Sequence, residues 1–317
     1  MTRAIAIDLG GTHCSIGLAE DRMLLAVRDI ELEATNGLAR MLPELRAQAL
    51  ELLAAHSLGP QDCLGVAVSL PSLVEFRSGR IVSTNDKYPD ATTLALGDWC
   101  RESFGLPLAV ENDARAALMG EYTCGAAEGA SDVLMLTLGT GIGSAVLVGG
   151  RPFRTGQAQG GNLGGHIPVA LDGRACTCGA IGCMEAEASS WALPLIVAGW
   201  EGVATSSLAK IAVVNFQILF EHARSGDLIA QAIARHCMHV WSVGLVGLIH
   251  AYGPELVVLG GGIMRNAAEI LPPLEEYVQA HAWTPSGRVR ITPALLGNHA
   301  SLYGAIPLLH EFLHGAL

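Results

Sequence analysis

The chain has 317 residues, half of them hydrophobic, and a formal net charge of −11. This length and hydrophobic content are sufficient for about two packed domains and exclude a disordered chain. Lysine occurs only at Lys87 and Lys210, and there is no basic run. We therefore expect a small-molecule partner, and neither nucleic acid nor a membrane surface.

The cysteine pattern and the N-terminus predict a cytoplasmic protein. Five of the eight cysteines are scattered through apolar stretches without a disulfide framework, which is typical of reduced thiols. The apolar start of the chain reaches Asp8 too soon for a signal peptide. The longest apolar run, 238–252, is shorter than the about 20 residues that span a bilayer, so we interpret it as part of a buried helix.

Two segments far apart in the sequence share one design. Residues 4–18 and 133–148 each contain an apolar run of strand type, a glycine-rich turn and a second apolar run. This pattern predicts a β-hairpin with few side chains at its tip. Because the design occurs twice, we expect the chain to consist of two related halves.

The remaining segments alternate between strand and helix patterns, which indicates an α/β fold with closely packed domains. The expected order is helix 38–55, strand 63–70, loop 81–93, helix 94–104, strand 106–110, mostly helical stretches 186–219 and 227–250, strand 254–259 and closing helix 300–313. The strand at 106–110 leads into Glu111-Asn112-Asp113. Open α/β sheets place their chemistry at such carboxyl ends of strands.

A cluster of potential metal ligands lies in the middle of the chain. His166 is followed by Cys176, Cys178 and Cys183, and thiolates with neutral imidazole are the ligands that Zn²⁺ prefers. The alternative is a pair of buried thiols beside a loop, but cysteines in a CxC spacing are poor disulfide partners. We expect a structural zinc site.

Three glycine-rich strand ends suggest a site for a nucleotide polyphosphate, because backbone N–H groups there can approach an anion. They are Gly10-Gly11, Gly139-Thr140-Gly141 and Gly260-Gly261-Gly262. Any one of them alone could be an ordinary turn. The chain has no GxxxxGK[ST] motif, and residues 139–143 lack the GxGxxG spacing of dinucleotide binders, so a phosphate clamp made of hairpins remains.

Phosphoryl transfer requires a positioned metal ion, phosphate donors and a base near the accepting hydroxyl. Asp8 is a candidate for orienting Mg²⁺ or its waters, Thr12 and Thr140 for donating hydroxyls to phosphates, and Asp113 for removing the acceptor proton. Each has a simpler alternative. Asp8 could bond only to turn amides, and Asp113 could be only the N-cap of the helix that follows.

Six ordered motifs together resemble the ROK family (repressors, open reading frames and sugar kinases), over nearly the whole chain. The motifs are Asp8-Leu9-Gly10-Gly11-Thr12, Glu111-Asn112-Asp113-Ala114, Leu138-Gly139-Thr140-Gly141-Ile142-Gly143, Gly165-His166-Ile167, the cysteine motif that ends at Glu185, and Gly260-Gly261-Gly262. The resemblance implies an actin-like ATPase (ribonuclease H-like) fold with two lobes and a cleft for ATP and sugar. We expect residues 1–113 and 300–317 in the smaller lobe and residues 114–299 in the larger one.

The resemblance also implies roles for individual residues. Asp113 is the expected general base, and Asn112 and Glu185 are the expected hydrogen-bond partners of the sugar. His166 is expected to contact the sugar and to bind zinc together with the three cysteines. The two hairpins are expected to hold phosphates, and the turn 260–262 to lie near the adenosine. Homodimers are common in the family.

Three stretches depart from the family pattern. Leu163 stands where the family usually has a glutamate that bonds sugar hydroxyls, and Asn162 is a candidate for a substitute carbonyl. An unpaired buried hydroxyl costs about 1–3 kcal/mol, so we expect glucose to bind poorly. Asn85 or Asp86 stands in for a Pro-Asn pair of the other sugar loop, and Ser72 ends a motif that usually reads Gly-x-Pro-Gly. Neutral drift is the alternative for these changes.

These observations predict an ATP- and Mg²⁺-dependent kinase for a hexose or hexose derivative, with the primary 6-hydroxyl as the expected acceptor. A sugar-binding sensor without efficient catalysis is the first alternative. A transcriptional repressor is disfavoured, because Asp8 leaves no room for a preceding helix-turn-helix domain and a basic footprint is absent. D-allose, N-acylhexosamines, fructose and glucose all remain open as substrates.

Overall fold

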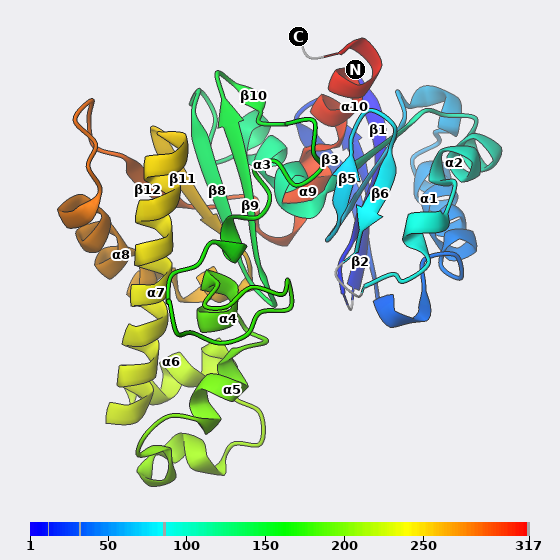
Figure 1. The fold of residues 1–317 in the computed structure, drawn as a ribbon. Helices are drawn as coiled ribbons and strands as arrows, with labels where there is room; N and C mark the ends of the chain where they lie inside the picture. Colours follow the sequence, from blue (N-terminus) through cyan, green and yellow to red (C-terminus); the bar gives the residue numbers. More distant parts are fainter. Residues whose placement is uncertain (12, 32, 85–86, 316–317) are drawn as a thin grey trace. The chain divides into compact units, whose positions relative to one another are not determined.

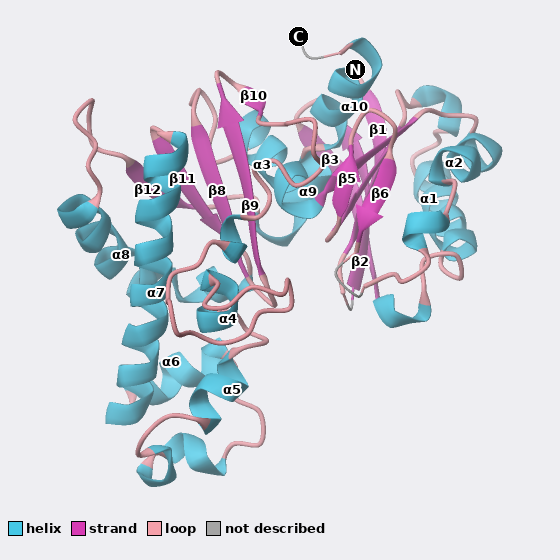
Figure 2. Cartoon of the chain, viewed as in Figure 1, coloured by secondary structure: helices cyan, strands magenta, loops and turns pink. Residues whose placement is uncertain are grey.

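The computed structural model of the chain describes residues 1–11, 13–31, 33–84 and 87–315 (Figure 1). The chain divides into two compact units. The first comprises Met1–Ala130, Arg151–Asn162 and Leu295–Leu317, and the second comprises Ser131–Gly150 and Leu163–Ala294. Each unit is built on a sheet flanked by helices (Figure 2).

The sheet of the first unit has the strand order β3-β2-β1-β4-β7. Its strands are β1 (Arg3–Leu9), β2 (His13–Glu20), β3 (Met23–Glu31), β4 (Val66–Leu70) and β7 (Leu108–Asn112). The first three form an antiparallel meander, and β4 and β7 run parallel to β1. All residues of β4 and β7 are buried, as expected for parallel strands covered on both faces.

Helices cover both faces of this sheet (Figure 1). One face carries α1 (Leu42–Ala55) and α2 (Leu96–Phe104), and the other carries α3 (Asp113–Cys124), α9 (Ala300–Tyr303) and α10 (Ala305–His314). A small hairpin of β5 (Leu73–Glu75) and β6 (Arg80–Ser83) follows β4. Helices α3 and α9 pack backbone to backbone, because a Cβ on Gly120 would lie 1.9 Å from the carbonyl oxygen of Ala300.

The sheet of the second unit contains the strands β9-β8-β11-β12 in that order. Their bounds are β8 (Val133–Leu138), β9 (Ile142–Val148), β11 (Leu256–Gly260) and β12 (Arg290–Pro293), and the short β10 (Arg151–Pro152) opens the segment 151–162 of the first unit. The helices of this unit are α4 (Met184–Ala188), α5 (Leu193–Ala198), α6 (Phe216–Arg224), α7 (Leu228–Tyr252) and α8 (Ala267–His281).

Helix α7 is the central helix of the second unit. It is long and apolar enough to cross a membrane by length and composition alone, but 56% of its most apolar window is buried inside the protein. Trp241 on this helix is fully buried, and α7 contacts β8, α4, α6 and α8. The expectation of a buried helix at 238–252 therefore agrees with the packing.

The two predicted hairpins are confirmed as β1–β2 and β8–β9. The stretch 186–219 is less helical than predicted, because it holds only the end of α4, the whole of α5 and the start of α6. Pro194 is the second residue of α5, and Gly202, with φ +78°, precedes short 3₁₀ turns. The predicted loop 81–93 contains most of β6.

The two compact units differ from the expected ranges of the lobes. Helix α3 belongs to the first unit, since it packs on α9, and residues 151–162 also belong to this unit. The first unit thus extends to Ala130 where the sequence suggested a limit at Asp113.

Candidate functional site

Asp8 lies near the carboxyl end of β1, beside Ser69 on the adjacent parallel strand β4. The Ser69 hydroxyl donates a hydrogen bond of 2.5 Å to Asp8 Oδ1. Burial raises the pKa of Asp8 to about 6, and the negative charge of Asp113 adds to this effect, while the Ser69 hydrogen bond opposes it. The Asp8 carboxylate is therefore held by a side chain of the neighbouring strand, and is not simply a turn residue.

Asp113 follows β7 directly and is the first residue of α3. Burial raises the pKa of its carboxyl group, while the Ala114 N–H and the positive charge of Lys87 lower it. The Ala114 N–H donates to Asp113 Oδ1 at 2.8 Å. Two carboxylates with raised pKa values thus lie at the carboxyl ends of strands in one sheet, the type of arrangement in which general bases occur.

Asn112, and not Asp113, is the N-cap of α3. Its Oδ1 accepts a hydrogen bond of 3.1 Å from the Arg115 N–H. Its Nδ2 donates to the Ser72 carbonyl at 3.1 Å and to Asp113 Oδ1 at 3.0 Å. The alternative that Asp113 only caps the helix is therefore wrong, because the residue before it has that role.

A buried ionic network lies directly behind Asn112 and Asp113. Glu111, which is fully buried, accepts hydrogen bonds from the Asn112 N–H at 2.7 Å and from the Arg115 guanidinium at 2.8 Å. Its second oxygen accepts from Arg154, which also forms an ion pair of 2.9 Å with Glu311. The two acidic and two basic side chains balance in charge, as a buried ionic group requires.

Arg115 also fixes the loop that precedes the cysteine motif. Its Nη2 donates to the Gly160 carbonyl at 2.6 Å and to Asn162 Oδ1. Asn162 Oδ1 thus accepts a hydrogen bond from Arg115 within the protein, and its contact with the sugar stays a prediction. The Asn162 amide nitrogen is buried and has no hydrogen-bond partner among the residues that the structure describes.

The turn after β1 is closed by backbone bonds and by Tyr88. The Gly10 N–H donates to the His13 carbonyl at 2.8 Å, and the Tyr88 hydroxyl donates to the Gly10 carbonyl. A Cβ on Gly10 would lie 2.8 Å from the His13 carbonyl oxygen, so this position requires glycine. A Cβ on Gly11 would lie 3.6 Å from Lys87 Cε, which places a cation beside the turn.

Sequence reasoning did not single out Lys87 as a site residue. Its side chain lies beside Gly11, and its positive charge lowers the pKa of Asp113; its rarity was the available signal, since the chain has only two lysines. Ser72 is buried, and its hydroxyl has no partner within the described part of the chain. Thr12, Asn85 and Asp86, which were predicted to bind phosphate or sugar, lie outside the described residues.

In the second unit, Glu185 connects α4 to the tip of the β8–β9 hairpin. The Glu185 carboxylate accepts a hydrogen bond of 2.7 Å from the Ile142 N–H and one of 3.1 Å from the Trp191 indole. A Cβ on Gly141 would lie 2.5 Å from Glu185 Oε2, so a side chain there would displace the Glu185 carboxylate. Within the tip, the Gly139 N–H donates to the Gly141 carbonyl at 3.0 Å, and Thr140 is exposed.

The four predicted metal ligands come together in the second unit. The ligand atoms of His166, Cys176, Cys178 and Cys183 all lie within 4.8 Å of one another. The distance from His166 Nδ1 to Cys176 Sγ is 3.5 Å, and that from Cys178 Sγ to Cys183 Sγ is 3.7 Å. Tetrahedral Zn²⁺ with ordinary bond lengths would separate such atoms by about 3.6 and 3.8 Å. The donor set therefore fits zinc in both chemistry and spacing.

The glycine turn after β11 packs against β8. Gly261 has φ +89°, and a Cβ there would lie 2.3 Å from the Leu138 carbonyl oxygen. Gly260 ends β11, and Gly262 has open space where a Cβ would be. Glycine is thus indispensable at position 261, and the turn keeps an accessible backbone at position 262.

Leu163, the residue that replaces the family glutamate, is 40% exposed.

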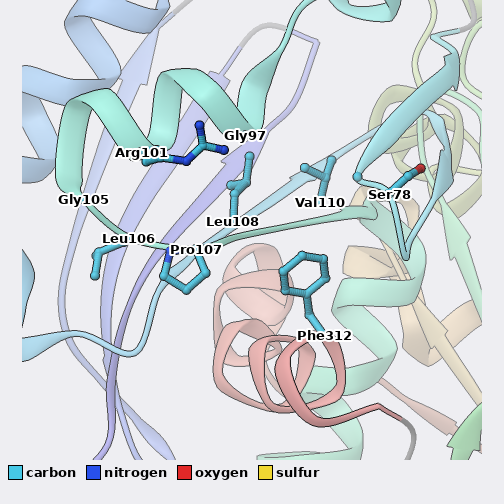
Figure 3. Close-up of a pocket in the computed structure, with 10 residues that line it drawn as sticks. Ser78, Gly97, Arg101, Gly105, Leu106, Pro107, Leu108, Val110 and Phe312 are labelled. Carbon is cyan, nitrogen blue, oxygen red and sulfur yellow. The ribbon is translucent and has the colours of Figure 1, made fainter.

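The first unit also contains a cavity of about 460 Å³, which is lined by residues other than those predicted for the site (Figure 3). Its lining includes Leu108 and Val110 of β7, Phe312 of α10 and the polar side chains of Ser78 and Arg101. None of the predicted site residues contributes to the lining, and the described lining has no carboxylate that could act as a base. The predicted residues instead form two groups, one around Asp8 and Asp113 and one around Glu185 and His166.

The chain is similar to known proteins over nearly its whole length. The ROK family model matches residues 4–312 of the chain. A glucokinase of Thermotoga maritima is 31% identical over 99% of this chain and 99% of its own length. The crystal structure of a ROK hexokinase from Thermus thermophilus covers 96% of both chains at 30% identity, with a TM-score of 0.78.

A second solved structure is a ROK family glucokinase from Streptomyces griseus in complex with glucose and AMPPNP. It is 27% identical, covers 95% of this chain and 97% of its own, and has a TM-score of 0.77. Both comparisons confirm the predicted mixed α/β, actin-like ATPase fold with two lobes. The chain therefore belongs to the ROK family.

Proposed function

We propose that the protein is an ATP- and Mg²⁺-dependent kinase that transfers the γ-phosphate of ATP to a hydroxyl of a hexose or hexose derivative, with the 6-hydroxyl as the acceptor. The observation that carries this proposal is Asp113, a carboxylate with a raised pKa at the end of β7. The proposal is supported by relatives named as glucokinase and hexokinase.

In this proposal Asp113 takes the proton from the sugar hydroxyl as that oxygen attacks the γ-phosphorus in line. The backbone and Asn112 contacts of Asp113 hold its carboxylate in place, and the network of Glu111 and Arg115 supports the strand end. Asp8 would hold Mg²⁺ or its waters, and the ion would neutralise charge on the phosphates. Lys87 is placed to add a positive charge beside Gly11.

Several residues are proposed to contact the sugar. Asn112, Glu185 and His166 are carried over from the family motifs, and the buried, unpartnered hydroxyl of Ser72 supports adding this residue to the set. Asn85 and Asp86 stay predictions. The turns at Gly10-Gly11-Thr12 and Gly139-Thr140-Gly141 are proposed to bind phosphates, and Gly260-Gly261-Gly262 to lie near the adenosine.

Zinc is proposed to be structural. His166, Cys176, Cys178 and Cys183 would bind it, and Zn²⁺ would supply the charge that keeps the thiols ionised. The loop between His166 and Cys176 is also bound to α4, because the guanidinium and the backbone N–H of Arg174 both donate hydrogen bonds to Glu187. We further propose a cytoplasmic homodimer that acts on small molecules and needs neither nucleic acid nor a membrane, consistent with the negative charge of the chain.

Asp113→Asn should abolish most phosphoryl transfer. The amide preserves the shape of the side chain but cannot accept the proton, and loss of a general base typically costs about 10²-fold or more in kcat. Coupled measurement of ADP release checks this. Asp98→Asn changes an exposed carboxylate and should leave turnover intact. Normal turnover by a folded Asp113→Asn protein would refute the assignment.

Activity should fall on the acid side of neutrality. Asp8 and Asp113 must be ionised to act, and burial raises the pKa of Asp8 to about 6 and that of Asp113 above its usual range. We expect kcat/KM to decrease as the pH falls through about 6.

Ser69→Ala tests whether the ionisation of Asp8 sets this fall of kcat/KM at acid pH. It removes a hydrogen bond that favours ionised Asp8, so the acid limb should move up by about 0.5–1 pH unit. Ser78→Ala, at an exposed hydroxyl, should leave the profile unchanged. An identical pH profile for Ser69→Ala and the wild type would contradict the role given to this contact.

Purified protein should contain stoichiometric zinc, measurable by elemental analysis. Cys178→Ser should lose most of it, because one of four ligands is replaced by a weaker one, while Cys124→Ser should retain it. The proposed zinc site holds both His166 and the start of α4, which carries Glu185, and both residues are proposed to contact the sugar. The zinc-depleted protein should therefore also bind sugar more weakly. Zinc-free protein with unchanged stability and sugar affinity would contradict this proposal.

Leu163→Glu should raise kcat/KM for glucose by about tenfold, because a carboxylate restores an acceptor for a sugar hydroxyl. The measurement is ADP release with D-allose, an N-acylhexosamine, fructose and glucose. Leu163→Met, which keeps an apolar side chain of similar volume, is the matched control and should behave as wild type. If glucose activity is the same in both variants, Leu163 does not determine specificity.

A further inference from the structure

Trp191 forms hydrogen bonds both to the tip of the β8–β9 hairpin and to the Glu185 carboxylate beside it. Its backbone N–H donates to the Thr140 carbonyl at 3.1 Å, and the Ser190 N–H donates to the Gly139 carbonyl at 3.0 Å. The indole Nε1–H then turns back to Glu185 Oε1 at 3.1 Å. One residue thus bonds both the hairpin tip and the carboxylate beside it.

Glu185 needs both of its donors to hold one orientation. The terminal torsion of a glutamate side chain is broad, so a single hydrogen bond leaves the carboxylate free to turn. Here the indole holds Oε1 and the Ile142 N–H holds Oε2, and Glu185 is 4% exposed. With the indole in place, the second oxygen faces the hairpin backbone.

Trp191 also lies against the cysteine motif. Trp191 packs on Cys176, Cys183 and Ala186, so its ring is held by the same segment that carries Glu185. The indole therefore links the cysteine motif to the hairpin tip, to which the backbone of Trp191 also bonds. It can transmit a change at Glu185 to residues 139–142, and the reverse.

We propose that Trp191 is a positioning residue that couples sugar binding to nucleotide binding, an inference that rests on the kinase function proposed above. A sugar hydroxyl bonded to Glu185 adds a further restraint on the carboxylate that the indole has oriented. The carboxylate in turn holds the Ile142 N–H and so fixes the hairpin tip in the form that receives phosphates. Nucleotide bound to the tip favours sugar binding by the same factor, since coupling is reciprocal.

The test is a thermodynamic cycle by calorimetry. The Kd of AMPPNP is measured without sugar and with saturating hexose, using the hexose of lowest KM from the substrate panel. The ratio of the two values is the coupling factor. We expect about fivefold or more in the wild type, in the usual range for coupled sites, and about twofold or less in Trp191→Phe, which retains an aromatic ring but lacks the N–H.

Trp283→Phe makes the same chemical change at an indole that is 81% exposed, and should retain the full coupling factor. Zinc content and melting temperature are measured in parallel. A role in packing alone would lower zinc content and both single affinities but leave the ratio unchanged. If Trp191→Phe loses zinc, Trp191→Tyr fills more of the space without placing a donor at the indole position, and its coupling should also be lost.

The outcomes separate this inference from the proposed function. If the wild type shows no coupling, or if Trp191→Phe keeps the wild-type ratio, the role of Trp191 is refuted while hexose turnover stands. If no hexose binds the wild type and none is phosphorylated, the kinase function itself fails.

Discussion

A buried carboxylate must be met by hydrogen-bond donors, and much of this structure is arranged to meet that requirement. Glu111 and Glu121 are fully buried, and Glu185 and Glu187 nearly so. Glu121 accepts the N–H groups of Ala126, Leu295 and Leu296, so it holds the place where the chain re-enters the first unit. Glu111 holds the end of β7, Glu185 holds the tip of the β8–β9 hairpin, and Glu187 holds the loop of the cysteine motif.

The carboxylates proposed to do chemistry differ from these structural ones. Glu111 is paired with two arginines, whereas Asp8 and Asp113 are desolvated more than they are compensated, and their pKa values are raised. Titratable groups perturbed in this way are typical of active sites. The same sheet therefore carries one acidic group that stabilises the strand end and two that are proposed to act in phosphoryl transfer.

Local patterns predicted much of this arrangement. Apolar runs broken by glycine gave the two hairpins, and the spacing of His166 and the cysteines gave four ligand atoms that come together. The sequence also indicated that Asp113 follows a strand. Each of these features depends on residues close together in the chain, where periodicity and turn chemistry are informative.

Other features depend on residues far apart in the chain. Arg115 donates a hydrogen bond to Asn162, 47 positions away in the sequence, and the Lys87 side chain lies beside Gly11 through the tertiary fold. Trp191 reads as an ordinary apolar residue until its indole is seen to bond Glu185. The breaks in 186–219 were in principle readable at Pro194 and Gly202, but the overall helical pattern hid them.

Direct analysis of the reaction product tests the central claim most directly. The wild-type protein is incubated with Mg²⁺, ATP and each hexose in turn, and the sugar product is examined by phosphorus NMR. The account predicts ADP and a sugar 6-phosphate in equal amounts for at least one hexose. ADP released without any phosphorylated sugar, or no turnover with any hexose, would contradict it.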